Sequence, residues 1–141
     1  MNDSPFMVTL YFRGDNLEPD VITKQLGVLP TDTRRKGEER HGKQGRVYTN
    51  RTGIWKLRAA TVSNELSEHI EELTSKFKKE KIVSDIMCVE EAFIDVFLCY
   101  DRLGESDSYC FELTEENIRN ISLLGVSVQF TVSSYKELEE M

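Results

Sequence analysis

The sequence AFIDVFLCY, residues 92–100, predicts a β-strand that is buried on both of its faces. Successive side chains of a strand point to opposite faces of a sheet. One face would therefore carry Ala92, Ile94, Val96 and Leu98, and the other Phe93, Phe97 and Cys99. A strand that is apolar on both faces usually lies in the centre of a sheet. Asp95 is a charge among these apolar neighbours, which favours a hydrogen-bonded or edge-facing carboxylate over a catalytic one.

Four other segments alternate apolar and polar residues with a period of two, which predicts further strands. Two lie in the first half of the chain, at residues 6–13 and 53–58, and two in the second half, at residues 109–113 and 126–132. The strand at 109–113 would return from the central strand as a hairpin. The side chains that we expect to point inward are Phe6, Val8, Leu10, Phe12, Trp55, Leu57, Val126, Val128, Phe130 and Val132.

Three segments carry the signals of helices. The first covers residues 18–26, with Pro19 in its first turn and Gly27 as its C-terminal cap. The second begins at a Ser63 or Asn64 cap and continues to about Lys79, and the third begins at a Thr114 cap and ends at Gly125. The apolar stripes of the last two helices are Leu66, Ile70, Leu73 and Phe77, and Ile118, Ile121 and Leu124.

These elements predict an α+β fold, a mostly antiparallel sheet with about three helices packed on it. The two halves of the chain share the order strand, glycine-capped helix, strand. We expect a single domain over residues 1–141, with its core at about 6–132, a long basic surface loop or hairpin at 31–52 and a polar tail at 133–141. Residues 81–89 are compatible with either a short helix or a strand.

The net charge of -7 over 141 residues hides an asymmetry along the chain. Residues 1–58 hold 11 Lys and Arg against 7 Asp and Glu, whereas residues 59–141 hold 7 against 18. The acidic total argues against nucleic acid as the default partner, and no apolar run is long enough for a membrane helix. No secretory signal is visible, and the three cysteines do not form a CxxC pair. We therefore expect a cytoplasmic protein.

No sequence motif of the chain indicates a catalytic role. The glycines at 42 and 45 lack the strand and helix that flank a phosphate-binding loop, and no nucleophile elbow or HExxH sequence is present. Neither histidine lies at ligand spacing from a cysteine. We therefore expect no metal, no cofactor and no enzymatic activity. A small enzyme whose site escapes motif analysis stays open as an alternative.

The basic loop is the most distinctive polar feature of the chain. Its candidate binding residues are Arg34, Arg35, Lys36, Arg40, His41, Lys43 and Arg46, with Tyr48 close by. Arginines beside a tyrosine can hold a phosphate or stack a base. The same loop could instead contact a protein, or could simply be a solvated segment that offsets the acidic remainder of the chain.

Several short motifs follow one another along the chain in a distinctive order. After the aromatic opening strand come Gly14-Asp15, Leu29-Pro30-Thr31, Arg35-Lys36-Gly37 and Gly53-Ile54-Trp55-Lys56-Leu57, and Leu123-Leu124-Gly125 precedes the last strand. In this order the chain resembles the bacterial domain-of-unknown-function family 4279 over about residues 6–132. The resemblance supplies no catalytic residues. It implies a small cytoplasmic bacterial protein and an association with toxin–immunity gene neighbourhoods.

We accordingly expect a non-enzymatic binding protein of the immunity type, which neutralises a cognate toxin by covering its active surface. The excess of acid in residues 59–141 suits a basic toxin domain as partner. The acidic candidates flank or lie within the central strand and are Glu90, Glu91, Asp95, Asp101, Glu105 and Asp107. The alternative is a regulatory module that binds a phosphorylated ligand or RNA through the basic segment 34–46. The oligomeric state is left open.

Overall fold

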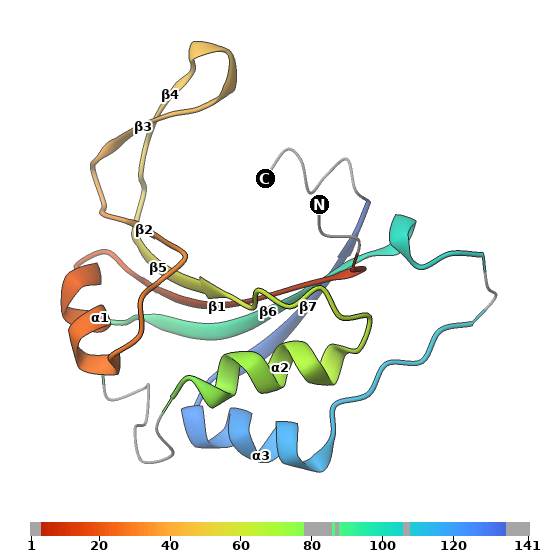
Figure 1. Ribbon diagram of the computed structural model, residues 1–141. Helices are drawn as coiled ribbons and strands as arrows, with labels where there is room; N and C mark the ends of the chain where they lie inside the picture. The colour runs from red at the N-terminus through yellow and green to blue at the C-terminus, as the bar shows by residue number, and fades with distance from the viewer. Residues whose placement is uncertain (1–3, 78–85, 87, 106–107, 135–141) are drawn as a thin grey trace.

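The computed structural model describes residues 4–77, 86, 88–105 and 108–134 of the chain. Its centre is a five-stranded sheet in the order β2-β5-β1-β6-β7 (Figure 1). The strands are β1 (Phe6–Gly14), β2 (Asp32–Arg34), β5 (Gly53–Arg58), β6 (Glu91–Cys99) and β7 (Ser127–Ser133). All pairings are antiparallel except that of β6 with β7. The α+β class and the central position of the 92–100 strand are therefore confirmed.

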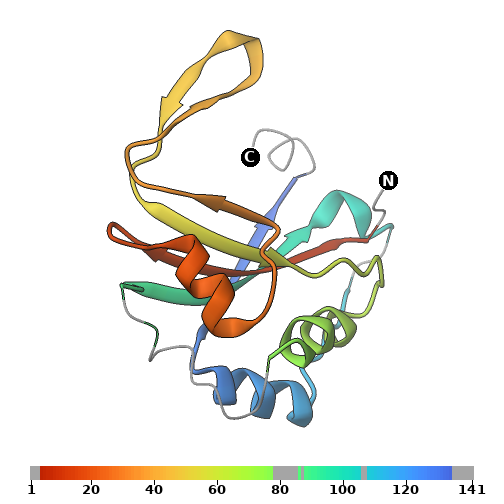
Figure 2. The same cartoon turned by 60° about the vertical axis from the view of Figure 1, so that its left-hand side comes forward.

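Three helices cover one face of this sheet, and a small hairpin rises on the opposite side (Figures 1 and 2). The helices are α1 (Pro19–Leu26), α2 (Leu66–Ser75) and α3 (Glu115–Leu124). The hairpin consists of β3 (Glu39–His41) and β4 (Val47–Thr49), joined through the 3-10 turn η1 (Lys43–Gly45). A second 3-10 turn, η3 (Tyr100–Arg102), follows β6. The segment 31–52 thus contributes an edge strand and a hairpin.

The core lies between the sheet and the helices. The fully buried side chains include Val8, Leu10, Phe12, Trp55 and Ile94 from the strands and Ile22, Ile70 and Leu73 from the helices. The indole Nε1 of Trp55 donates a hydrogen bond of 3.0 Å to Thr23 Oγ1 of α1, so even the polar atom of this ring has a partner. The predicted inward residues of the segments 6–13 and 53–58 are all buried.

The helix ends follow local chemistry, with one exception. Gly27 and Gly125 both adopt the left-handed conformation, with φ of 70° and 74°, and end α1 and α3 as predicted. Thr114 caps α3: its Oγ1 accepts a hydrogen bond from the backbone N–H of Asn117, and its own backbone N–H donates one to Asn117 Oδ1. The predicted cap of α2 is wrong. This helix begins at Leu66 after Glu65, and Ser63 Oγ accepts instead from the Glu65 backbone N–H.

Four other expectations from the sequence are wrong. The segment 109–113 is not a strand. The described strand that follows β6 in the chain is β7, which comes after α3 and pairs parallel with β6, so the predicted hairpin is not formed. The helix α2 ends at Ser75 rather than near Lys79, which lies outside the described residues. Ile118 is 57% exposed, and the buried side of α3 is formed by Asn117, Ile121 and Leu124. Phe130 and Val132 are exposed, although Val128 on the same face packs against the core.

The two halves share their element order but not their pairing. In the first half, β1 and β2 flank α1 in the chain but are not neighbours in the sheet, because β5 lies between them and pairs antiparallel with both, whereas β6 and β7 flank α3 and pair parallel. The ambiguous segment 81–89 is described only at residues 86, 88 and 89, which lie outside helices and strands.

Candidate functional site

The candidate site lies on the sheet face opposite the helices, where β2, β5 and β1 run side by side. In the register of the sheet, Ile54 of β5 pairs with Arg13 of β1 on one side and with Arg34 of β2 on the other. Directly paired residues point to the same face. Neighbouring strands are about 4.8 Å apart, so the backbones of the two arginines are about 10 Å apart, with Ile54 between them.

The hairpin β3–β4 supplies a second wall. Arg40 pairs with Tyr48 across the hairpin, and the guanidinium carbon lies 4.8 Å from the centre of the tyrosine ring. Gly42 packs so closely against this ring that a Cβ atom at position 42 would overlap it unless the exposed ring moved. The ring of Tyr48 is therefore held between its own hairpin partner and the turn.

The base of the hairpin is fastened by Asn50. Its backbone N–H donates to Glu38 O at 2.9 Å, its carbonyl accepts from Gly37 N at 2.9 Å, and its Nδ2 donates to Arg35 O at 3.1 Å. The Oδ1 atom of the same side chain is buried and has no partner among the described residues. These contacts fix the short linker into β5, which carries Arg51 and Thr52.

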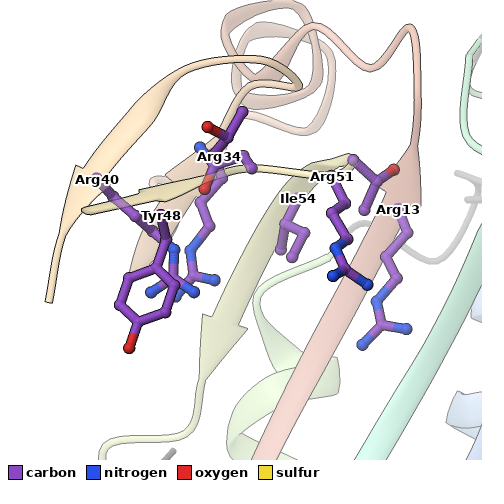
Figure 3. A pocket seen from close by; sticks show the side chains of 9 residues that line it. Arg13, Arg34, Arg40, Tyr48, Arg51 and Ile54 are labelled. Atoms are coloured by element: carbon purple, nitrogen blue, oxygen red, sulfur yellow. The ribbon is translucent and has the colours of Figure 1, made fainter. Parts of the chain in front are cut away.

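Together these parts line an open cavity of about 390 Å³. This lies within the range of roughly 300–1,000 Å³ that is common for small-ligand pockets. We call it the arginine pocket, and its lining residues are Arg13, Arg34, Arg40, Tyr48, Thr49, Asn50, Arg51, Thr52 and Ile54. Figure 3 shows the four arginines and Tyr48 pointing to one side of the ribbon. In this view Ile54 lies between Arg34 and Arg40 on one side and Arg51 and Arg13 on the other.

The charge of the arginine pocket is only partly balanced. Arg13 Nη1 lies 3.7 Å from Glu91 Oε2, and Arg34 Nε lies 3.8 Å from Asp32 Oδ2, both long for ion pairs. Within the described part of the chain, neither Arg40 nor Arg51 has a carboxylate partner. Guanidinium groups that line one cavity repel one another, and a bound anion would relieve that repulsion.

The positive potential extends to the next row of the sheet. Burial holds the pKa of Lys56 below its ordinary value, and the guanidiniums of Arg58, Arg34 and Arg40 lower it further, although Asp32 acts in the opposite direction. The pKa of Lys56 is thus lowered in part by two of the arginines that line the arginine pocket, Arg34 and Arg40.

Comparison with protein families places the chain. The model of the family described as "Domain of unknown function (DUF4279)" matches residues 4–135. The chain belongs to the DUF4279 family. No match was found among curated proteins or among solved structures. The resemblance drawn from the sequence is confirmed, and this family description assigns no activity, so the chemistry of the site rests on its geometry.

In this DUF4279 member, two of the seven basic candidates line the pocket, Arg34 and Arg40. Arg35 instead binds the start of α1, with Nη1 2.5 Å from Glu18 Oε2 and Nη2 3.0 Å from Asp20 Oδ2. Lys36 Nζ lies 3.1 Å from Asp15 Oδ2. The other three, His41, Lys43 and Arg46, lie exposed around the hairpin turn and outside the pocket lining.

The acidic candidates do not form one surface. Glu90 and Glu91 lie at the start of β6, near Arg13, whereas Asp101 and Glu105 follow its other end, and the nine-residue strand is about 30 Å long. Asp95 is buried in the middle and accepts a hydrogen bond of 2.8 Å from Thr131 Oγ1, as its apolar neighbours suggested. Asp107 lies outside the described residues.

Arg13 is the principal site residue that the sequence did not indicate as a candidate. It is 21 positions before Arg34 and outside the basic segment. One signal was present: Arg13 alternates with Phe12, which faces the core, so it had to lie on the opposite face.

Among the described residues, no helix is long and apolar enough to cross a membrane, and no three His, Cys, Asp or Glu side chains come together as metal ligands.

Proposed function

We propose that this protein is a non-enzymatic binding module that holds a phosphorylated ligand in the arginine pocket. The observation that carries the proposal is the convergence of four arginines on one cavity, two of them without a carboxylate partner in the described chain. Guanidinium groups form paired, charge-assisted hydrogen bonds with phosphate oxygens. Thr49, Asn50 and Thr52 line the same cavity and make the rest of its wall polar but uncharged.

The lining also favours binding over catalysis. Its ionisable side chains are four arginines and Tyr48. Arginine stays protonated at any physiological pH, so it orients and neutralises an anion but does not take up a proton. The lining includes none of the His, Cys, Asp, Glu or Lys side chains that usually act as general acid, general base or nucleophile.

The test is calorimetric titration with inorganic pyrophosphate. Arg40→Ala and Arg51→Ala each remove a guanidinium from the pocket, and Arg46→Ala removes one from the same hairpin outside the pocket. We expect each pocket variant to weaken pyrophosphate binding at least tenfold, about 1.4 kcal/mol, and Arg46→Ala to retain most of the wild-type affinity. No pyrophosphate binding by the wild-type protein, or equal losses in all three variants, would reject the arginine pocket as the site.

We propose a second function for the opposite side of the molecule, where the helices form an acidic surface. Glu68 and Glu71 of α2 and Glu115 and Glu116 of α3 are exposed, and α3 also exposes Ile118 and Leu123. Apolar side chains inside a charged rim are typical of protein interfaces. This supports an immunity-type role in the bacterial cytoplasm, in which the helix surface covers the active surface of a basic toxin domain.

The two proposals are separable. If the helix surface binds a toxin domain, the protein from its native cell would carry that domain in a stable one-to-one complex. The double variant Ile118→Arg/Leu123→Arg would release the toxin domain, and Arg40→Ala would not. A complex that withstands the helix variant but not the pocket variant would move the protein interface to the arginine pocket.

A further inference from the structure

A pair of aromatic side chains lies beside the arginine pocket on the same face of the sheet. Tyr11 of β1 and Phe93 of β6 are cross-strand partners, and their rings stack with centroids 5.1 Å apart and planes 18° apart. Both side chains are half-buried. This pair is one step of the strand period from the row that contains Arg13, so the aromatic pair and the pocket are adjacent.

Arg13 connects the two features. Its guanidinium carbon lies 5.2 Å from the centre of the Phe93 ring and 5.8 Å from that of Tyr11, and the same side chain lines the arginine pocket. A phosphate held by Arg13 would therefore be next to the aromatic pair.

Cationic groups continue along the sheet beyond the pocket. Lys56 pairs with Tyr11, and Arg58 pairs with Thr9 in the following row of β1 and β5. The Nε–H of Arg58 is buried and has no hydrogen-bond partner among the described residues. These two basic groups thus continue along β5 away from the pocket, so the positive charge on this face does not end at the pocket.

This face has none of the three helices on it. All three pack against the other face, and β3–β4 stands at the far end, beside the pocket (Figures 1 and 2). The acidic side chains of α2 and α3 belong to the helix side, so the net charge of -7 does not describe the field above the pocket.

We propose that the ligand of this face is a single-stranded nucleic acid, whose phosphates occupy the arginine pocket and one of whose bases stacks on the Tyr11–Phe93 pair. This inference rests on the proposed function of the pocket and names its ligand class. Proteins that bind single strands combine a basic groove for the backbone with aromatic side chains for the bases, often on an open sheet. A lone phosphate or pyrophosphate would use the pocket and leave the aromatic pair unused.

The experiment measures fluorescence anisotropy with labelled oligo(U) and oligo(dT) of about ten nucleotides, a length within the site sizes of single-strand binders. The same protein is titrated with pyrophosphate. The double variant Tyr11→Leu/Phe93→Leu keeps apolar bulk but removes the rings, and Tyr100→Leu makes the same change at an exposed tyrosine elsewhere. Thermal melts confirm that each variant is folded.

We expect the double variant to weaken oligonucleotide binding roughly tenfold or more, the size of one lost base–aromatic stack, with pyrophosphate binding and the Tyr100→Leu control unchanged. Arg40→Ala and Arg51→Ala would weaken both ligands, and oligonucleotide affinity would fall steeply with added salt. Binding of either oligo(U) or oligo(dT) supports the proposal. Pyrophosphate binding without oligonucleotide binding, or an unchanged affinity in the double variant, overturns the nucleic-acid inference alone. If the wild-type protein binds neither the oligonucleotides nor pyrophosphate, the function proposed for the pocket is overturned as well.

Discussion

The two faces of the central sheet differ in both chemistry and cover, although they are made from the same strands. In β1, Leu10 and Phe12 point to the helices and are fully buried, whereas Tyr11 and Arg13 point to the other side, where Arg13 lines the arginine pocket and Tyr11 lies beside it. Adjacent residues therefore serve different purposes. The difference teaches that the covered face can hold the fold while the opposite face keeps a cluster of like charges.

The strongest challenge to this division is a pair of neighbouring substitutions in β5. Trp55→Ala removes the largest fully buried side chain and its hydrogen bond to Thr23, and we expect a loss of about 3–5 kcal/mol in unfolding free energy. Ile54→Ala, one position away on the pocket face, should cost about 1 kcal/mol. Urea denaturation followed by circular dichroism measures both. If Ile54→Ala were the more costly change, the covered face would not be the main source of stability.

A milder substitution tests whether the helix layer supports the fold without shaping the pocket. Thr114→Ala removes the cap of α3 and should lower the unfolding free energy by about 1 kcal/mol. Ser122→Ala, at an exposed position of the same helix, is the control and should change stability little. Pyrophosphate affinity measured by calorimetry should be the same in both variants. A tenfold drop in affinity for Thr114→Ala would mean that the two faces are coupled.

Removing a pocket charge should weaken ligand binding and leave the stability of the ligand-free protein nearly unchanged. Without ligand, Arg51→Gln should change the unfolding free energy by less than about 0.5 kcal/mol, because this exposed side chain has no ion-pair partner in the described chain. Denaturant melts with and without pyrophosphate separate the two effects, and only the ligand-dependent gain in stability should shrink. A large loss without ligand would show that Arg51 holds the hairpin in place.

The smallest expected effect concerns the ion pairs beside the pocket. The pKa of Asp15 lies below its ordinary 3.8, chiefly because Lys36 donates a hydrogen bond to its carboxylate and secondly because Thr52 donates another. A depressed carboxyl pKa stabilises the folded state above 3.8, and this contribution is lost as the pH falls through the lower, folded-state value. Lys36→Ala should raise the pKa of Asp15, as read from an NMR titration of its carboxyl carbon, and leave pyrophosphate binding intact. An unshifted titration would remove Lys36 as the cause.

The sequence was informative where a local pattern controls the outcome. The apolar run at 92–100 predicted the central strand, and Gly27 and Gly125 predicted two helix ends. Periodicity also assigned Phe130 and Val132 to the correct face, but β7 is an edge strand and these two side chains are exposed there. Phe111 is the opposite case, a side chain that packs on the core although its segment is not a strand. Its ring contacts that of Phe6 edge to face, with centroids 4.9 Å apart. Alternation specifies a direction and does not specify a partner.

The site divides in the same way. Arg34 and Arg40 were candidates because the basic segment is contiguous in sequence. Arg13 joins them only through the pairing of β1, β5 and β2, which is a tertiary event. Conversely, Arg35 and Lys36 belong to the same run, but the carboxylates to which they donate hydrogen bonds are 15–21 residues away in the sequence and could not be assigned from charge alone.

The pairing of Arg13, Ile54 and Arg34 also restricts how the chain can misfold. A slip of one residue between two strands exchanges the faces of every side chain in the shifted strand. Such a slip in β1 would turn Arg13 toward the helices and Phe12 toward water, and burying an unpaired guanidinium is costly. Each incorrect alignment is therefore penalised twice, once by the exposed aromatic residue and once by the buried cation. The charges that prepare this face for an anion also help the folding chain to reject its nearest alternative alignments.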